Sequence, residues 1–275
     1  MDLLKDKVAV ITGACGTLGG AFTKAYVQEG AKVIMTDRQA PSPELEQELK
    51  EMGADYIFVP CDITNSEEVK NVFEKAVEKY GTVDILINNA GKLSCDPLSN
   101  SRRKDYIELV TKPVEKHALD VTPHITDEEW KSFFEVNVHG TFYCTREALK
   151  IMEQHHFGRI INIASTAGMC GQSPFAPHYA TSKAAVIGFT KTVAMEAAGD
   201  NICVNAIACG GIAAPAQMAT LESMGEQGRR EFFQMIPLGR LGTPEEYASL
   251  AVWLASDGGS YMVGQIISPN GGWVI

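Results

Sequence analysis

Thr12-Gly13-Ala14-Cys15-Gly16-Thr17-Leu18-Gly19-Gly20 stands between an apolar run at residues 7–11 and a helical pattern at residues 17–29. Glycines at such a junction let the backbone turn sharply and approach a pyrophosphate, and the helix N-terminus then offers free N–H groups and the positive end of its dipole. The alternative is an ordinary strand-to-helix turn, but the strand before and the helix after favour a nucleotide site. We expect this loop to contact a dinucleotide through Gly13, Cys15, Thr17, Leu18 and Gly19.

The same change from a short apolar run to a helical pattern recurs along the chain. Continuous apolar runs, as expected for parallel strands buried on both faces, occur at residues 7–11, 31–36, 55–60, 83–88, 159–163, 202–207 and 264–268. Helical periodicity occurs at residues 17–29, 66–79, 127–154 (with a break near 137–140) and 179–197. Capping boxes are expected at Thr126 with Glu129 and at Thr243 with Glu246. This alternation predicts an α/β fold, a seven-stranded parallel sheet with helices on both faces.

Composition limits the class of protein. The chain has 275 residues, 45% of them hydrophobic, and a formal charge of −10, which argues against a disordered or fibrous chain and against nucleic acid as a partner. Apolar runs stay well short of the roughly 18 residues of a membrane span, and the polar N-terminus leads directly into a strand, so we expect a cytoplasmic protein without a membrane partner. The seven scattered cysteines predict free thiols, and neither they nor the six histidines have metal-ligand spacing.

Polar residues at three further strand ends extend the predicted nucleotide site. Asp37 ends the second strand, where a carboxylate accepts hydrogen bonds from the adenosine ribose hydroxyls and repels a 2′-phosphate. We therefore expect NAD, with NADP less favoured, although Arg38 is able to attract a phosphate or stack on adenine. The remaining contacts are expected after the third and fourth strands, from Asp62, Ile63, Asn89, Ala90 and Gly91.

Four side chains predict the chemistry. Tyr179 and Lys183 are one helical turn apart, so an ammonium would lower the phenol's pKa and make it a proton donor and acceptor for an alcohol or carbonyl oxygen. Ser165 ends the fifth strand and is expected to hydrogen-bond that oxygen. Asn137 is expected to hold a water that relays protons from Lys183. Each residue alone has an ordinary explanation: Tyr179 and Lys183 as a surface pair, Ser165 as a strand-end residue, and Asn137 as a polar residue at a helix irregularity. Their combination in a chain with a nucleotide loop indicates a catalytic site.

These stretches resemble the short-chain dehydrogenase/reductase family. They are TGACGTLG at Thr12, NNAG at Asn88, NVHG at Asn137, IAS at Ile163, YATSK at Tyr179 and NAIACGG at Asn205, in the family's order over nearly the whole chain. The resemblance implies a single-domain Rossmann fold over residues 1–275 and a catalytic tetrad of Asn137, Ser165, Tyr179 and Lys183. It further implies that Tyr179, Lys183, Gly210 and Ile212 contact the cofactor, and that the chain forms a homotetramer or dimer.

The sequence departs from the family pattern at four places. Thr17 replaces a loop glycine, Cys209 replaces the proline after the sixth strand, and Ala214 replaces a threonine that often contacts the nicotinamide, so that backbone groups of Gly211 and Ile212 would have to substitute. Residues 92–124 form an added, irregular segment near the expected active-site mouth. We interpret it as a substrate-shaping wall or lid; an oligomer contact is the alternative.

We therefore expect an NAD-dependent oxidoreductase that interconverts a secondary alcohol and a ketone of the hydroxyacyl thioester, cyclic alcohol, steroid or sugar class. The alternative is a non-catalytic nucleotide-binding subunit or structural partner, suggested by the changes at Thr17, Cys209 and Ala214. Residues 213–235 are expected to cover a small-molecule pocket as a lid. The expected substrate contacts are Ser165, His178, Tyr179, Gly211 and Met218.

Overall fold

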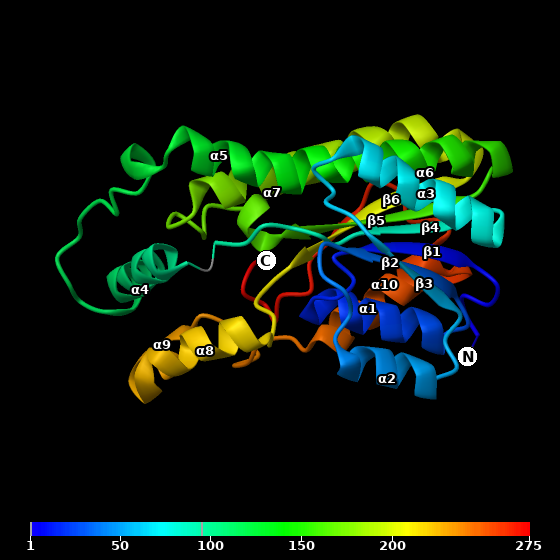
Figure 1. Cartoon of the computed structure of the whole chain (residues 1–275). Coiled ribbons are helices and arrows are strands. Elements are labelled where there is room, and N and C mark those ends of the chain that lie inside the picture. Colours follow the sequence, from blue (N-terminus) through cyan, green and yellow to red (C-terminus); the bar gives the residue numbers. More distant parts are fainter. Residues whose placement is uncertain (1, 95) are drawn as a thin grey trace.

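The computed structural model describes residues 2–94 and 96–275 (Figure 1). Within these residues, seven strands form one parallel sheet in the order β3-β2-β1-β4-β5-β6-β7. The strands are β1 (Val8–Thr12), β2 (Lys32–Asp37), β3 (Tyr56–Pro60), β4 (Ile85–Asn88), β5 (Gly158–Ser165), β6 (Ile202–Cys209) and β7 (Ile266–Ile267). The predicted sheet is confirmed, and each predicted run agrees with its strand to within two residues at either end.

The apolar runs are continuous because each central strand is buried on both faces. On β1, Ala9 and Ile11 belong to the hydrophobic core on one face of the sheet. Val8 and Val10 belong to the core on the other face. Successive side chains of a strand point to opposite faces, so a strand covered on both sides shows a continuous apolar run and not an alternation of apolar and polar residues.

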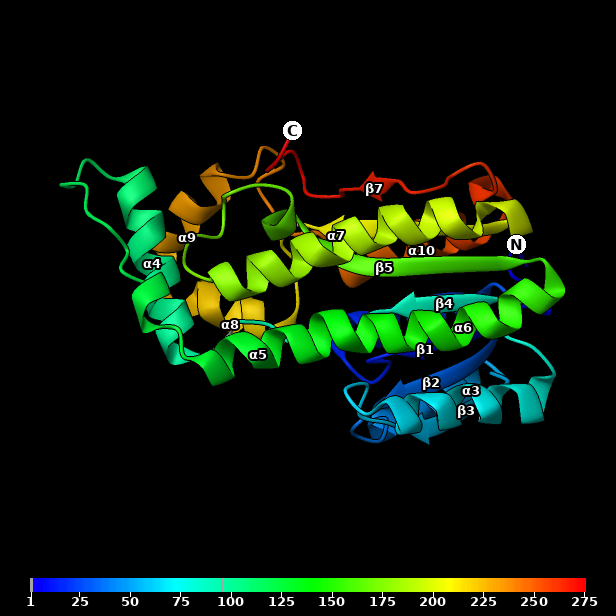
Figure 2. The same ribbon diagram turned by 90° about the horizontal axis from the view of Figure 1, so that it is seen from above.

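Helices cover both faces of this sheet (Figures 1 and 2). One face is covered by α1 (Thr17–Gln28), α2 (Pro43–Glu51) and α10 (Pro244–Ala255). The opposite face is covered by α3 (Ser66–Tyr80), α6 (Thr141–His155) and α7 (Pro177–Ala197). This is the doubly wound arrangement expected from the alternation of strands and helices.

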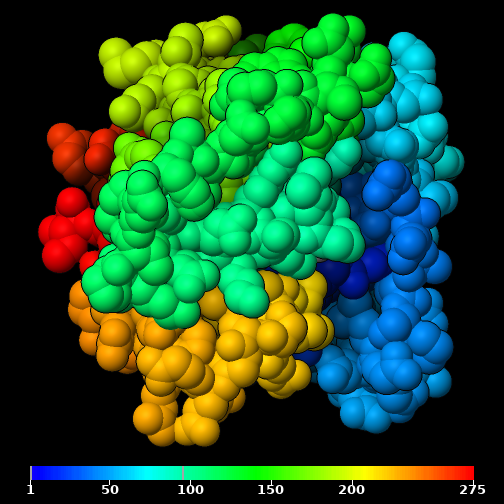
Figure 3. All heavy atoms as spheres, turned by 90° about the vertical axis from the view of Figure 1, so that its left-hand side faces the viewer, coloured from blue at the N-terminus to red at the C-terminus, as the bar shows by residue number. Residues whose placement is uncertain are grey.

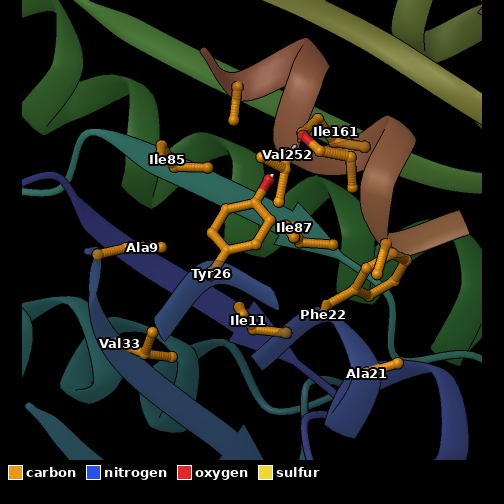
Figure 4. Packing of buried hydrophobic residues seen from close by; sticks show 14 of the residues in the cluster. Ala9, Ile11, Ala21, Phe22, Tyr26, Val33, Ile85, Ile87, Ile161 and Val252 are labelled. Carbon is orange, nitrogen blue, oxygen red and sulfur yellow. Dashed lines mark hydrogen bonds between the residues drawn. The ribbon is translucent and has the colours of Figure 1, made fainter. Parts of the chain in front are cut away.

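The core under α1 shows how a polar group is accommodated in it (Figure 4). Phe22 and Tyr26 of α1 are fully buried against Ile11 and Val33 of the sheet. The Tyr26 hydroxyl donates a 2.9 Å hydrogen bond to the carbonyl of Ala251 on α10. A buried hydroxyl without a partner is destabilising, so this bond makes the large aromatic ring compatible with the core and ties α1 to α10.

Four more helices extend beyond the carboxyl ends of the strands, where Figures 1 and 2 place them together. They are α4 (Pro97–Thr111), α5 (Asp127–Phe134), α8 (Pro215–Ser223) and α9 (Gly225–Gln234). Helix α4 corrects the expectation of an irregular segment at residues 92–124. It is begun by Asp96, whose carboxylate accepts from the N–H groups of Leu98 and Ser99, and by Pro97 at the first helical position.

The predicted break in the long helical region is confirmed. Of the two predicted capping boxes, one is confirmed. A π-helical segment, Glu135–Gly140, separates α5 from α6. Thr243 and Glu246 form a complete capping box at α10. Thr126 caps α5 by accepting from the Glu129 N–H, but the Glu129 carboxylate lies 3.7 Å from Nε2 of His178. Within the described residues, the reciprocal bond of a capping box is therefore present at Thr243 and not at Thr126.

Candidate active site

The loop after β1 and the loop after β4 are joined by hydrogen bonds at the point where the strand order reverses. Thr12 Oγ1 accepts from the N–H groups of Asn89 and Ala90, both at 3.0 Å. Asn89 Nδ2 donates to the carbonyls of Thr12 and Gly13 at 2.9 and 3.0 Å. Parallel α/β sheets bind ligands at such a crossing point, and these bonds hold both loops in place there.

Two glycines of the first loop are required by close approaches of the backbone. Gly13 has φ +63°, and a Cβ on it would lie 2.8 Å from Cα of Ala90. A Cβ on Gly19 would lie 2.0 Å from the carbonyl oxygen of Gly13. Gly16 has no such constraint, since its Cβ would be 3.5 Å from the nearest atom, and Thr17 is accommodated as the first residue of α1. The loop therefore turns although Thr17 stands where the family has glycine.

Helix α1 begins at this loop without a side-chain cap. Its N-cap residue is Gly16, and its first turn holds no acidic residue. The first N–H groups of the helix are thus not satisfied by a capping side chain and, together with the dipole, favour an anion. The predicted loop residues Gly13, Thr17, Leu18 and Gly19 all line the adjacent cavity.

The carboxylate of Asp37 lies in the same cavity and is held by the backbone. Its Oδ2 accepts from the Cys15 N–H at 3.1 Å and its Oδ1 from the Gln39 N–H at 3.3 Å. Cys15 is a correction: its N–H is engaged by Asp37, and the residue is not one of those that line the cavity. The other predicted cofactor residues that line the cavity are Arg38, Asp62, Ile63, Asn89, Ala90, Gly91, Gly210 and Ile212.

The structure brings Ser165, Tyr179 and Lys183 together at the other part of this cavity. Ser165 ends β5, where its Oγ accepts from the Ala167 N–H at 3.2 Å. Tyr179 and Lys183 project from the first two turns of α7. Nζ of Lys183 donates a 2.7 Å bond to the carbonyl of Ile163 on β5. A Cβ on Gly91 would lie 3.4 Å from this Nζ, so the strand-end glycine leaves room for the lysine.

Burial determines the charge behaviour of the lysine and of the cysteine beside it. Desolvation by burial lowers the pKa of Lys183 to about 8, and the nearby Cys209 acts in the opposite direction. Burial raises the pKa of the Cys209 thiol to about 12, so the thiol is neutral at physiological pH. Cys209 thus fills the place of the family's proline as a small neutral group.

Asn137 lies close to Lys183 and is held by the added segment and by α7: a Cβ on Gly91 would be 3.3 Å from Asn137 Oδ1 and 3.4 Å from Lys183 Nζ. Its Oδ1 accepts from the Lys92 N–H at 2.7 Å, and its Nδ2 donates to the Lys92 carbonyl and to Ser182 Oγ at 3.2 and 2.9 Å. The side chain is 1% exposed and does not line the cavity. Its amide therefore fixes the start of the added segment against α7, and the proton relay through this side chain stays a prediction.

Two of the predicted substrate contacts are also corrected. His178 is fully buried and bonds through Nε2 to Ser94 Oγ at 3.0 Å, because the position before Tyr179 faces the interior behind the cavity wall. Burial lowers the pKa of His178, which favours its neutral form. Met218 on α8 does not line the cavity, whereas its neighbour Gln217 does. Ser165, Tyr179 and Gly211 do line it.

Further residues complete a cavity of about 1090 Å³ that joins the nucleotide loops to Tyr179. They come from the loop after β4, from α4, from the loop before α7, from the segment at residues 213–235 and from the C-terminus. They are Leu93, Ser94, Arg103, Tyr106, Ile107, Gln172, Phe175, Phe232, Met235 and Trp273. The sequence predicted that residues 92–124 and 213–235 border the site, but it singled out no side chain of the loop before α7. Figure 3 looks onto this end of the molecule, where the teal added segment lies above the orange α8 and α9.

The described residues were also compared with the requirements of a metal site and of a membrane-spanning helix, and they meet neither. Over residues 2–94 and 96–275, no three His, Cys, Asp or Glu side chains are grouped as metal ligands would be. In the same residues no helix combines the length and the apolar character that crossing a bilayer requires.

Comparison with known proteins gives the family. Residues 7–225 match the model of the short chain dehydrogenase family. The chain is 37% identical to the 3-oxoacyl-[acyl-carrier-protein] reductase FabG of Thermotoga maritima, over 99% of both chains. It is 34% identical to a 3-oxoacyl-[acyl-carrier-protein] reductase of Synechocystis sp., over the full length of both. It is also 35% identical to the nodulation protein G of Rhizobium meliloti, over 98% of this chain and 97% of that one.

Solved structures agree with this assignment. Levodione reductase superposes with a TM-score of 0.82 at 26% identity, and 98% of each chain is covered. A putative short-chain alcohol dehydrogenase from Sinorhizobium meliloti gives 0.83 at 27% identity, over 98% of this chain and 97% of that one. The strand order, the joined glycine loop and the full-length sequence matches lead to one conclusion: this chain is an oxidoreductase that belongs to the short-chain dehydrogenase family.

Proposed function

We propose that this oxidoreductase uses NAD to interconvert a secondary alcohol and a ketone, with Tyr179 as the proton donor and acceptor. The observation that carries the proposal is the continuous cavity, which is lined at one end by Gly19 and Asp37 and at the other by Ser165 and Tyr179. To interconvert an alcohol and a ketone, the nicotinamide must exchange a hydride with the carbon while a side chain exchanges a proton with the oxygen on that carbon. This cavity has room for both groups.

The residues present fit a nicotinamide dinucleotide. The close approach at Gly13 and Gly19 and the uncapped N-terminus of α1 form a cradle suited to a pyrophosphate. Asp37 would accept from the ribose hydroxyls, and its charge disfavours a 2′-phosphate, which is the basis for proposing NAD over NADP. When bound, the nicotinamide supplies the hydride acceptor or donor.

The protein's own groups would handle the proton and orient the substrate. In oxidation the Tyr179 oxygen takes the hydroxyl proton; in reduction it returns a proton to the carbonyl oxygen. The Ser165 hydroxyl would stabilise developing negative charge on that oxygen, an effect of about 2.7–4 kcal/mol for comparable donors. Charged Lys183, held by the Ile163 carbonyl, would favour the phenolate form of Tyr179.

The substrate classes to test first follow from the similar proteins. Two relatives are named as 3-oxoacyl-[acyl-carrier-protein] reductases, and one structural neighbour as a levodione reductase. We therefore propose 3-oxoacyl thioesters and cyclic ketones as the leading candidates among the ketones that such a site accepts.

The test is a substrate panel of these two classes with NADH and NADPH, followed by absorbance at the reduced nicotinamide band. NADH should be the better cofactor, and replacing Asp37 by serine should lower the NADH-to-NADPH ratio of kcat/KM by about 10-fold or more. Tyr179→Phe should retain NADH binding and lose nearly all turnover. Tyr261→Phe, the same change at a 98% exposed position, is the matched control.

Two outcomes would reject the proposal. Full activity of Tyr179→Phe would remove the tyrosine from the mechanism. Absence of NADH binding at millimolar cofactor, measured by fluorescence titration, would favour a structural partner without nucleotide chemistry.

A further inference from the structure

The added segment places a cation in the wall of the substrate end of the cavity. Arg103 lies on α4 and lines the same cavity as Ser165 and Tyr179. Its guanidinium carbon lies 4.9 Å from the centroid of the Phe175 ring. Its Nη2 donates to the Ser94 carbonyl at 3.1 Å and its Nη1 to Asn100 Oδ1 at 3.0 Å. Contacts on separate segments thus fix the plane of the guanidinium.

The surroundings of this cation are mainly apolar. The carboxylates that line the cavity within the described residues are Asp37 and Asp62, at the nucleotide end, and Glu135, which pairs with His139 at 3.0 Å. Phe175 stacks on Arg103, and a second cation, Lys92, also lines this cavity. Further lining side chains carry no charge: Leu93, Tyr106, Ile107, Phe232 and Trp273. A guanidinium in an apolar wall makes the site favourable for an anion, because charge interactions strengthen as water is excluded.

The position of α4 is fixed relative to both the lid and the catalytic helix. Ile107 packs in a small core with Leu221 and Phe232 of the segment at residues 213–235 and with Ile236 directly after it. Ser94, whose carbonyl receives the Arg103 bond, also contacts His178 through its hydroxyl, immediately before Tyr179 on α7. Arg103 is therefore held at a set position relative to the reacting end of the cavity.

We propose that Arg103 binds a carboxylate of the substrate, so that the protein converts an oxo acid and the corresponding hydroxy acid. The inference rests on the proposed alcohol–ketone reaction at Tyr179, and it adds free oxo acids to the ketones to be tested. The apolar wall around Arg103 fits a hydrocarbon spacer between the reacting carbon and the carboxylate. A guanidinium is the side chain best suited to a planar carboxylate, and the pair forms charge-assisted hydrogen bonds.

Binding without turnover tests the inference separately from the reaction. The complex of the full chain with NAD is titrated with hexanoate and with hexanamide, which have the same shape but differ in charge. The acid should bind about 10- to 100-fold more tightly in the wild type. Arg103→Gln should remove this preference, and Arg103→Lys should retain part of it. Lys104→Gln, at an exposed position one residue along α4, is the matched control and should behave as the wild type.

Turnover then separates the two proposals. The probes are 5-oxohexanoate and 7-oxooctanoate with their methyl esters, each assayed with NADH. Preference for the acids in the wild type that is lost in Arg103→Gln supports the inference. Equal use of acid and ester by the wild type, or an acid preference unchanged in Arg103→Gln and Arg103→Lys, overturns it. Acid-selective binding without reduction of any ketone would instead reject the proposed function and leave the carboxylate site standing.

Discussion

Lys183→Met should stabilise the folded chain at neutral pH while it removes the proposed activity. The lysine is 5% exposed, and methionine has a similar length without the charge. A residue that is retained despite an unfavourable effect on stability is expected to serve the reaction. The prediction therefore links the energetics of burial to the chemistry proposed for α7.

The magnitude follows from the buried charge. Burial lowers the pKa of Lys183 from 10.5 to about 8, which corresponds to roughly 3 kcal/mol of unfavourable free energy while the group is charged. Methionine also loses the 2.7 Å bond to the Ile163 carbonyl, which contributes about 1 kcal/mol. The variant should therefore be more stable than the wild type by about 2 kcal/mol at neutral pH.

The pH dependence gives this difference a sign that can be checked. Between the folded pKa near 8 and the unfolded value of 10.5, the unfolded wild-type chain binds a proton that the folded chain does not. Wild-type stability then rises with pH, and the advantage of the variant should shrink. Urea unfolding near pH 7 and about pH 9.5 measures the difference, with exposed Lys191→Met on the same helix as control. A variant less stable than the wild type at neutral pH, or a difference independent of pH, would refute the reasoning.

Three other substitutions test the structure. Gly19→Ala should abolish NADH binding in a fluorescence titration, because its Cβ would lie 2.0 Å from the Gly13 carbonyl oxygen, whereas Gly16→Ala should retain binding; equal affinities would contradict the loop geometry. Tyr26→Phe should lower the free energy of unfolding by about 1–2 kcal/mol, because the Ala251 carbonyl loses its buried partner; an unchanged urea midpoint would count against that bond. Thr243→Ala should destabilise by about 1 kcal/mol by removing the capping box, and no change in midpoint would show that the cap contributes nothing.

The sheet was predictable because burial on both faces leaves a direct pattern in the sequence. β1 is apolar at every position but its last, β6 has Asn205 as its one polar residue, and the nucleotide loop follows the first of the seven runs. Helix α4 was not predictable from periodicity, since its buried positions include Ser99 and Arg102 as well as Ile107. The signal that was available is local: an Asp followed by Pro at residues 96–97 is a strong helix start.

The direction of a site side chain was predictable where it follows from the spacing of residues along a helix. It was not predictable where it depends on contacts with distant parts of the chain. Tyr179 and Lys183 share a helix face because they are four residues apart, so their common cavity follows from the sequence. The directions of Asn137 and His178 depend on Lys92 and Ser94, which lie far away in the chain. The sequence shows a basic cluster at residues 102–104, which suits either a solvated face or an anionic substrate. It does not single out Arg103, because the place of that residue in the cavity wall depends on how α4 packs against α8 and α9.

A crystal structure of the chain with bound NADH would test the central claim most directly. The account predicts that the adenosine ribose contacts Asp37, that the pyrophosphate lies at the N-terminus of α1, and that C4 of the nicotinamide faces the Tyr179 hydroxyl. A nicotinamide ring placed away from Tyr179, or a cavity filled there by protein atoms, would contradict the account.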